Sequence, residues 1–131
     1  MKTLIVEDDF TSRIFLQEML KSYGRVDIAV NGRESVEAVQ ASLSAGEHYD
    51  LILMDIMMPE MNGQEALQHI RNAEETAGII IGKGAKVIMT TALGDKDNIM
   101  DAFRHAADGY MVKPVDKQKL LEKLRELELT A

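Results

Sequence analysis

The stretch Asp50-Leu-Ile-Leu-Met-Asp55-Ile-Met-Met-Pro59 decides the fold of this chain. Its apolar run, residues 51–54, stands next to turn-forming residues, which predicts a short strand buried on both faces of a parallel sheet. Asp55 follows directly, and a carboxylate at the exit of a buried strand is costly unless it meets a cation, hydrogen-bond donors or water. The stretch therefore predicts a central strand with a polar site at its end.

A second acidic group follows another apolar run near the start of the chain. Residues 3–6 form that run, and Glu7-Asp8-Asp9 come directly after it. In open parallel sheets, ligands bind outside the carboxyl ends of the strands. Two strand exits that carry acids therefore predict one metal site at this edge of the sheet.

Composition narrows the class of protein. The 131 residues are 46% hydrophobic and 28% charged, which predicts a single globular domain over residues 1–131. No apolar run approaches the roughly 20 residues of a membrane span, and the absence of cysteine excludes disulfides and thiolate metal sites. A net charge of −7 argues against nucleic-acid binding. Met1-Lys2 leads straight into the first strand, so we expect no signal peptide and a cytoplasmic location.

The rest of the chain alternates predicted strands with predicted helices. Leu16, Met19, Leu20 and Tyr23 recur at helical spacing, and Asn62 with Glu65 resembles a capping box. The predicted strands are residues 3–6, 26–30, 51–54, 85–90 and 109–112. The predicted helices are residues 10–23, residues 33–45, one capped by Asn62, one from Asp95 and one from Asp116 to Leu127. This pattern predicts a doubly wound α/β fold, with a five-stranded parallel sheet and five helices on its two faces.

The remaining strand exits add a hydroxyl and an ammonium group to the predicted site. Thr90-Thr91 follow the fourth strand, and Lys113-Pro114 follow the fifth. Mg²⁺ prefers oxygen ligands, usually one or two carboxylates with waters and a phosphate oxygen. Lysine supplies a charge for phosphate, and a hydroxyl supplies a donor. The set therefore suits Mg²⁺ together with a phosphoryl group.

Four segments carry a resemblance to the receiver domains of two-component response regulators, the family of the single-domain chemotaxis regulator. Each segment lies at a predicted strand exit, and all four come in the family's order. They are Val6-Glu7-Asp8-Asp9, residues 53–63, Met89-Thr90-Thr91-Ala92 and residues 109–114. The resemblance covers residues 4–127 and implies the flavodoxin-like strand order 2-1-3-4-5.

The resemblance also implies a role for individual residues around the metal. Asp55 would be the phosphoacceptor. Asp8 and Asp9 would hold Mg²⁺ directly or through water, together with Asp55 and the main-chain carbonyl of Met57. Carboxylates gathered in this way repel one another, so we expect a divalent ion to stabilise the protein.

Three further residues would respond to the phosphoryl group. Lys113 would contact its oxygens, and the Lys113-Pro114 bond is often cis in the family. The hydroxyl of Thr91 would turn toward it, and Tyr110 would change rotamer with Thr91. Phosphorylation adds a charge near −2, and the surface formed by residues 95–107, 109–112 and 116–127 would then change its partner preference.

This resemblance implies a phosphoacceptor switch rather than an enzyme acting on other molecules. The chain would take its phosphoryl group from a histidine kinase or a phosphotransfer protein in a phosphorelay, and would catalyse only its own phosphorylation and dephosphorylation. Its partners would be that donor and an output protein, with neither membrane nor nucleic acid, and two copies could pair through the fourth helix, fifth strand and fifth helix. It could be a stand-alone regulator or the receiver portion of a longer one.

Other interpretations remain open at this point. Asp8 or Asp9 could simply cap the first helix. The chain could be a receiver scaffold that works without phosphorylation. A haloacid-dehalogenase-like phosphatase would need a second aspartate where Met57 stands, and the acids after the first strand would repel the phosphate of FMN in a flavodoxin-like flavin module.

Two departures from the family pattern lead to separate expectations. Residues 77–84 lengthen the connection before the fourth strand, and their three consecutive isoleucines could form an extra strand, a packed flap or a partner contact. Met57 and Leu93 lie two residues past Asp55 and Thr91, where variable residues tune hydrolysis. Neither side chain can orient an attacking water, so we expect a long-lived acyl phosphate.

Overall fold

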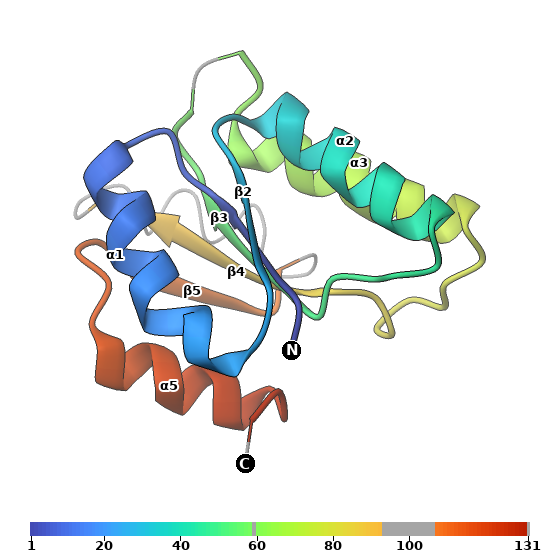
Figure 1. The fold of residues 1–131 in the computed structure, drawn as a ribbon. Helices are drawn as coiled ribbons and strands as arrows, with labels where there is room; N and C mark the ends of the chain where they lie inside the picture. The colour runs from blue at the N-terminus through green and yellow to red at the C-terminus, as the bar shows by residue number, and fades with distance from the viewer. Residues whose placement is uncertain (59, 93–106, 131) are drawn as a thin grey trace.

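A computed structural model describes residues 1–58, 60–92 and 107–130 of the chain, which form a central parallel sheet between helices (Figure 1). The sheet order is β2-β1-β3-β4-β5, as the resemblance implies. The strands are β1 (Thr3–Val6), β2 (Val26–Ala29), β3 (Leu51–Asp55), β4 (Lys86–Thr91) and β5 (Gly109–Val112). All neighbouring pairs are parallel, so their carboxyl ends share one edge.

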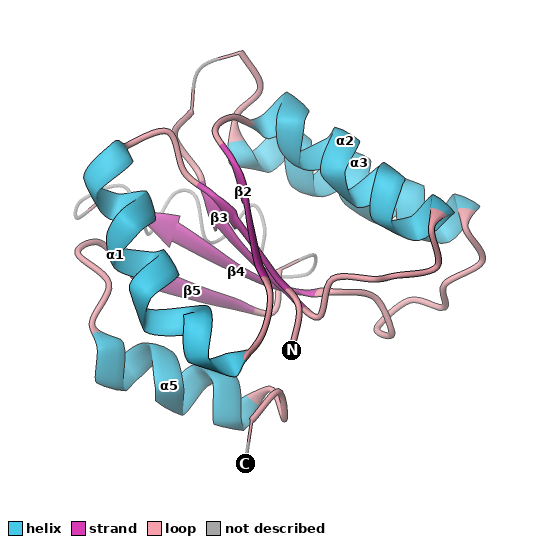
Figure 2. Ribbon diagram, in the orientation of Figure 1, coloured by secondary structure: helices cyan, strands magenta, loops and turns pink. Residues whose placement is uncertain are grey.

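Helices cover both faces of the sheet (Figure 2). On one face lie α1 (Phe10–Leu20), followed by a 3₁₀ turn (Lys21–Tyr23), and α5 (Lys117–Glu126). On the other face lie α2 (Gly32–Ser44) and α3 (Gly63–Thr76). The helix predicted from Asp95 falls in residues 93–106, outside the described part of the chain. The sequence predicts one α-helix over residues 10–23. In the structure α1 ends at Leu20, and the last turn is a 3₁₀ turn, as is common at helix ends.

The predicted central strand is confirmed. All residues of β3 are buried, and its side chains alternate between two hydrophobic clusters. Ile52 and Met54 pack with α2 and α3, while Leu51 and Leu53 pack with α1 and α5. The strand extends one residue further than predicted, so Asp55 is itself part of the sheet.

Side-chain caps fix where each described α-helix begins, just beyond the carboxyl edge of the sheet. In each case the side-chain oxygen of the capping residue accepts a hydrogen bond from the third residue after it, which satisfies an otherwise unpaired donor. The capping residues are Asp9, Asn31, Asn62 and Asp116. The predicted caps at Asn62 and Asp116 are confirmed. None of the helices in the described ranges is long and apolar enough to cross a membrane.

The lengthened connection forms turns before β4, so the prediction of an extra strand is wrong. Ile80 and Ile81 are 74% and 94% exposed, which also excludes a packed flap at these two positions. The connection is tied to the body of the protein at its end, where Glu74 accepts a hydrogen bond from the Ala85 N–H at 2.8 Å.

Candidate functional site

Three carboxylates meet at the carboxyl edge of the sheet. Glu7 follows β1, and its N–H continues the ladder by donating to Ala29 O at 3.1 Å. Asp55 ends the neighbouring strand β3. Glu7 is 1% exposed and Asp55 is 5% exposed, while Asp8 faces solvent. One oxygen from each of Glu7, Asp8 and Asp55 lies within 4.8 Å of the others, which is the geometry of a cation site.

Lys113, directly after β5, lies among these carboxylates. Its Nζ is 2.9 Å from both oxygens of Glu7 and 3.1 Å from Oδ2 of Asp55. The ammonium therefore supplies a cation of the kind that a carboxylate at a buried strand exit requires. The Lys113–Pro114 bond is cis, as the family resemblance suggests.

The site perturbs the ionisation of the groups that form it. Burial raises the pKa of Glu7 to about 7, and the charge of Asp55 adds to this rise, although Lys113 opposes it. Burial likewise raises the pKa of Asp55 against the opposing effect of Lys113. Burial alone would lower the pKa of Lys113, but its two carboxylate partners outweigh that effect and raise it. Each acid thus holds its proton more tightly than usual until more positive charge arrives.

Asp9 lies outside the group of three, although it was predicted as a metal residue. Its Oδ2 accepts from the Ser12 N–H at 2.8 Å and caps α1, and this bond lowers its pKa. The carboxylate that joins Asp8 and Asp55 is Glu7, which sequence reasoning left out of the metal set. A signal was available, because aspartate directly before a helix is a good cap and Glu7 immediately follows the strand.

Arg13 braces the turn that carries the first two acids. Its Nη1 donates to the main-chain oxygens of Glu7 and Asp8, at 3.2 Å and 3.1 Å. The guanidinium lies 5.5 Å from the centre of the Phe10 ring, on the outer side of α1. The turn between β1 and α1 is therefore held by a cation that leaves both carboxylates available.

The loop after β3 contacts Asp55 through its main chain. The Met57 N–H donates to Oδ1 of Asp55 at 3.2 Å, so the main chain of Met57 lies beside the site, as its predicted metal role requires. The Met57 side chain is 61% exposed. Pro59, in the same loop, lies outside the described residues, and so does Leu93, the other predicted hydrolysis-tuning position.

Thr91 and Tyr110, the predicted switch residues, lie on the neighbouring strands β4 and β5. Thr91 ends β4 and is buried, and its Oγ1 donates to Ala92 O at 3.4 Å. Its carbonyl accepts from the Lys113 N–H at 2.8 Å, which joins the switch threonine to the site lysine. Tyr110 is half-buried in β5, paired in register with Met89. Their switching roles remain predictions.

The three carboxylates fit a Mg²⁺ ion. All the offered ligands are oxygens, which this ion prefers, and bonds of about 2.1 Å place oxygens around one Mg²⁺ roughly 3–4 Å apart. The offered oxygens of the observed group lie within 4.8 Å of one another, which is compatible with that spacing. The predicted role of the Met57 main-chain carbonyl as a metal ligand stays a prediction.

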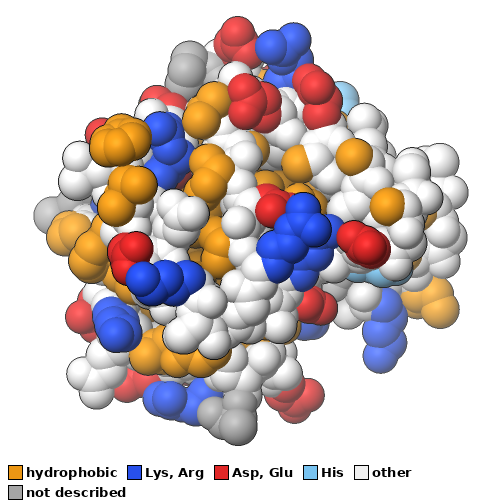
Figure 3. All heavy atoms as spheres, in the orientation of Figure 1, with side chains coloured by type: hydrophobic (Ala, Val, Ile, Leu, Met, Phe, Trp, Pro, Cys, Tyr) orange, Lys and Arg blue, Asp and Glu red, His pale blue; other side chains and the backbone are white. Residues whose placement is uncertain are grey.

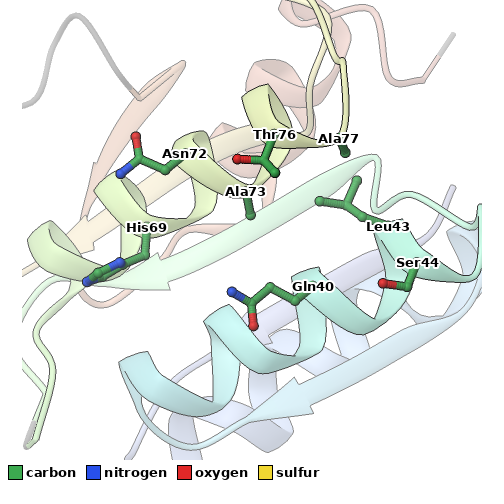
Figure 4. A pocket seen from close by; sticks show the side chains of 8 residues that line it. All are labelled: Gln40, Leu43, Ser44, His69, Asn72, Ala73, Thr76 and Ala77. Atoms are coloured by element: carbon green, nitrogen blue, oxygen red, sulfur yellow. The ribbon is translucent and has the colours of Figure 1, made fainter.

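Two hollows differ in their relation to this site. One of about 490 Å³ lies beside it and is lined by α1 and by the residues after β4 and β5: Thr11, Ser12, Phe15, Leu16, Ala92, Lys113, Pro114 and Val115. Hydrophobic side chains gather over the α1 side of the molecule (Figure 3), where Phe10, Ile14 and Phe15 are exposed. The other hollow, about 440 Å³ between α2 and α3, is lined by Leu43 and by polar and small side chains, without a carboxylate or ammonium group (Figure 4).

Comparisons with known proteins agree with the geometry. Residues 3–125 match the family model described as the response regulator receiver domain. The chain is 36% identical over 128 residues to the probable transcriptional regulatory protein SilR of Salmonella typhimurium, covering 97% of this chain and 50% of SilR. It is 35% identical over 125 residues to the chemotaxis protein CheY of Treponema pallidum, covering 94% of this chain and 79% of that protein.

A solved structure gives a similar picture. The receiver domain of the sensor histidine kinase PA1611 from Pseudomonas aeruginosa has a TM-score of 0.75 and 25% identity to this chain, with 97% of both chains covered. That structure has a magnesium ion coordinated in its active site cleft. The present chain thus spans about half the length of SilR but nearly all of an isolated receiver domain.

Proposed function

Because the chain belongs to the response regulator receiver domain family, we propose that Asp55 accepts a phosphoryl group from a histidine kinase or a phosphotransfer protein. One observation carries the proposal: Asp55 lies at the carboxyl edge of the sheet, within 4.8 Å of Glu7 and Asp8 and 3.1 Å from the Lys113 ammonium. Receiver domains of this family are signalling switches rather than classical enzymes, and this chain catalyses only its own phosphorylation and dephosphorylation.

The transfer is a displacement at phosphorus. An oxygen of ionised Asp55 forms a bond to phosphorus, the bond from phosphorus to the donor's imidazole nitrogen breaks, and the imidazole leaves with that electron pair. The product is an acyl phosphate on Asp55. Lys113 moves from the carboxylates toward the new phosphoryl oxygens, and the Thr91 hydroxyl becomes a donor to them. Positioning and electrostatics account for most of the rate, as in other phosphoryl transfers.

Glu7, Asp8 and Asp55 would hold Mg²⁺, and the main-chain carbonyl of Met57 would add a further oxygen. This assignment replaces the predicted Asp9 by Glu7, because Asp9 caps α1. When bound, Mg²⁺ supplies positive charge that offsets the charge of the transferring oxygens. Glu7 must then release Lys113, which leaves the ammonium free for the phosphoryl group.

Intact-mass measurement after incubation with acetyl phosphate and Mg²⁺ tests this proposal. The wild type should gain one phosphoryl group, and Asp55→Asn should gain none. Chelation of Mg²⁺ should also prevent the gain, which would show that the transfer depends on the metal. No gain by the wild type under any condition would favour a receiver scaffold that works without phosphorylation.

The apolar face of α1 is the docking surface for the phosphodonor. Phe15 is 51% exposed and lines the 490 Å³ hollow that also contains Lys113, so a helix seated there lies beside the acceptor. Replacing Phe15 with serine should slow phosphorylation by any phosphohistidine protein that labels the wild type. Phosphorylation by acetyl phosphate should not change, because this small donor needs no docking surface. An equal effect on both donors would contradict the docking role.

The output surface lies on β5 and α5. A hollow of about 440 Å³ between these two elements includes Tyr110, the predicted rotamer switch, and charged residues of α5 such as Lys119 and Glu122. This face meets an output protein in the cytoplasm, or a second copy of the chain, once Asp55 is phosphorylated. Sedimentation with and without acetyl phosphate distinguishes the second copy from a different partner.

A further inference from the structure

The loop between β3 and α3 is anchored to its surroundings at both its base and its start. At its base, the Gly63 N–H donates to Ile56 O at 2.9 Å and closes the loop. At its start, the Met57 N–H donates to Oδ1 of Asp55 at 3.2 Å. A shift of the Met57 main chain therefore reaches the phosphoacceptor carboxylate directly.

The far side of the loop rests against the first residue of α2. A Cβ atom built on Gly32 would lie 2.2 Å from the Met61 carbonyl oxygen and 2.9 Å from its carbon, closer than real Cβ atoms come to other atoms. Both partners are main chain, so no side chain can rotate out of the way. Met61 also packs against the hydrophobic cluster beneath it, which restricts its retreat.

Helix formation does not explain a glycine at position 32. Gly32 is the first residue of α2 and follows the cap Asn31, whose side chain accepts from the Glu34 N–H at 2.8 Å. Alanine is the better helix former. The close approach of the Met61 carbonyl is therefore what requires glycine. The adjacent Arg33–Glu60 ion pair, 3.7 Å long and exposed, adds little to this contact.

We propose that Gly32 is a positioning residue of the phosphoacceptor site. Its missing side chain lets the β3–α3 loop lie against α2, and the loop then holds the main chain of Met57 against Asp55. The inference rests on the proposed function of Asp55, Glu7 and Asp8. A methyl group at position 32 pushes the Met61 carbonyl away and shifts the loop. Displacements of about 1 Å at a reacting group cost on the order of 100-fold in rate.

The chain offers a matched control at the opposite edge of the sheet. A Cβ atom on Gly84 would lie 2.3 Å from the carboxylate atoms of Glu74, about as close as the approach at Gly32, but here the neighbour is the end of a side chain rather than main chain. Gly84 precedes β4, so its surroundings are remote from Asp55. The variants Gly32→Ala and Gly84→Ala therefore both strain the fold, but only Gly32→Ala strains the loop at the site.

Two measurements on wild type, Gly32→Ala and Gly84→Ala test the proposal. Calorimetric titration should show that Gly32→Ala raises the Mg²⁺ dissociation constant about tenfold or more, as loss of supporting contacts around metal ligands does, whereas Gly84→Ala stays near the wild type. In metal-free protein, the NMR amide resonances of Met57 and Asn62 should move in Gly32→Ala only. Trimethylamine N-oxide, which strengthens burial, keeps either variant folded if it is unstable.

Wild-type Mg²⁺ affinity in Gly32→Ala, or an equal loss in Gly84→Ala, would overturn the positioning role. Unmoved amides of Met57 and Asn62 in metal-free Gly32→Ala would overturn it as well. A wild type that binds no Mg²⁺ would instead refute the proposed function. The metal-free amide resonances would still report whether residue 32 positions the loop, so the two failures are distinguishable.

Discussion

Glu7 and Glu74 are both almost fully buried, but they lie at opposite edges of the sheet and have different partners. At the amino edge, Oε1 of Glu74 accepts from Arg71 at 2.8 Å and Oε2 accepts from the Ala85 N–H at 2.8 Å. The nearby Asp108 accepts from Arg71 and from the Val87 N–H. Each carboxylate there has donors from both a guanidinium and the main chain.

The carboxyl edge is built differently. Both oxygens of Glu7 share the Lys113 ammonium with Asp55, and an oxygen of Asp8 lies within 4.8 Å of an oxygen of each of these two acids. Three clustered acids with one ammonium leave negative charge that a divalent cation can offset. Glu74, with donors from a guanidinium and the main chain, stabilises the fold. Glu7 shares the Lys113 ammonium with Asp55, so it can exchange this cation for a metal ion.

The largest expected effect concerns Glu74 at the amino edge of the sheet. Glu74→Ala leaves the Ala85 N–H without its acceptor and breaks a buried ion pair with Arg71, so the free energy of unfolding should fall by about 3 kcal/mol. Urea denaturation measures the change. The Mg²⁺ dissociation constant of the folded variant should equal that of the wild type. A loss below about 1 kcal/mol would mean that Glu74 does not stabilise the fold in the way its contacts suggest.

The second prediction is that Mg²⁺ affects the stability of variants at the two edges differently. For the wild type, Mg²⁺ at 100 times its dissociation constant should raise the free energy of unfolding by about 2.7 kcal/mol. In Glu7→Gln the affinity falls tenfold or more, so the increment at the same Mg²⁺ concentration drops to about 1.4 kcal/mol or less. Glu74→Ala should keep the full increment on its lower baseline. An undiminished increment in Glu7→Gln would remove Glu7 from the metal site.

Without metal, Glu7 makes stability depend on pH in an unusual direction. Burial raises its pKa from 4.5 to about 7, so the folded state binds the proton more tightly than the unfolded state does. The contribution of Glu7 therefore lowers the free energy of unfolding as pH rises from 4.5 to about 7. Over the same interval, Mg²⁺ affinity should rise, because the metal needs the ionised carboxylate.

Denaturation curves across this pH range, recorded with a chelator, measure the effect. The matched variant is Glu7→Gln, which cannot titrate and should remove most of the negative slope. Asp55 contributes in the same direction, since burial also raises its pKa. A metal-free slope identical in wild type and Glu7→Gln would show that folding does not raise the pKa of Glu7.

Sequence reasoning predicted the sheet well because its signals were local. The apolar run at residues 51–54 predicts β3, and Asn62 and Asp116 together with helical spacing predict where two helices begin. Each of these signals comes from residues that are close together in the sequence. Because Asp55 and Lys113 each lie at the carboxyl end of a predicted parallel strand, the sequence also predicts that they lie at the same edge of the sheet. Local pattern did not distinguish the neighbouring acids: Asp9 caps α1, whereas the buried Glu7 contacts Lys113.

The amino-edge network was invisible in the sequence for a different reason. Arg71 reaches Ala85 and Asp108, which lie 14 and 37 positions away along the chain. Neither spacing follows a helical or strand period, so no pattern predicts the contact. The tight approach of Gly84 to Glu74 also depends on how the lengthened connection folds back. Such contacts follow from packing of the whole chain rather than from local preference.

A smaller effect is expected from a third acid at the amino edge. The Tyr49 hydroxyl donates to Oδ2 of Asp27 at 2.7 Å, and the Lys2 ammonium lies 4.5 Å from the centre of the tyrosine ring. Burial would raise the pKa of Asp27, but the Tyr49 and Arg25 hydrogen bonds outweigh it and lower that pKa. Tyr49→Phe should cost about 1 kcal/mol in urea denaturation at neutral pH. The Mg²⁺ affinity of Tyr49→Phe should be unchanged, which would show that Asp27 contributes to stability and not to the metal site.

The smallest expected effect concerns the rim of the carboxyl edge. Met57 holds Asp55 through its main chain, while its exposed side chain carries only a thioether, which cannot donate a hydrogen bond to an attacking water. Asparagine keeps the main-chain contact and adds an amide, so Met57→Asn should lose its phosphoryl group a few times faster, a barrier change of about 1 kcal/mol. The decay of phosphorylated protein, followed by intact mass after the donor is removed, measures both rates. A wild type that loses the group faster than Met57→Asn would show that the apolar side chain does not slow hydrolysis, and that something else at this edge sets the lifetime of the signal.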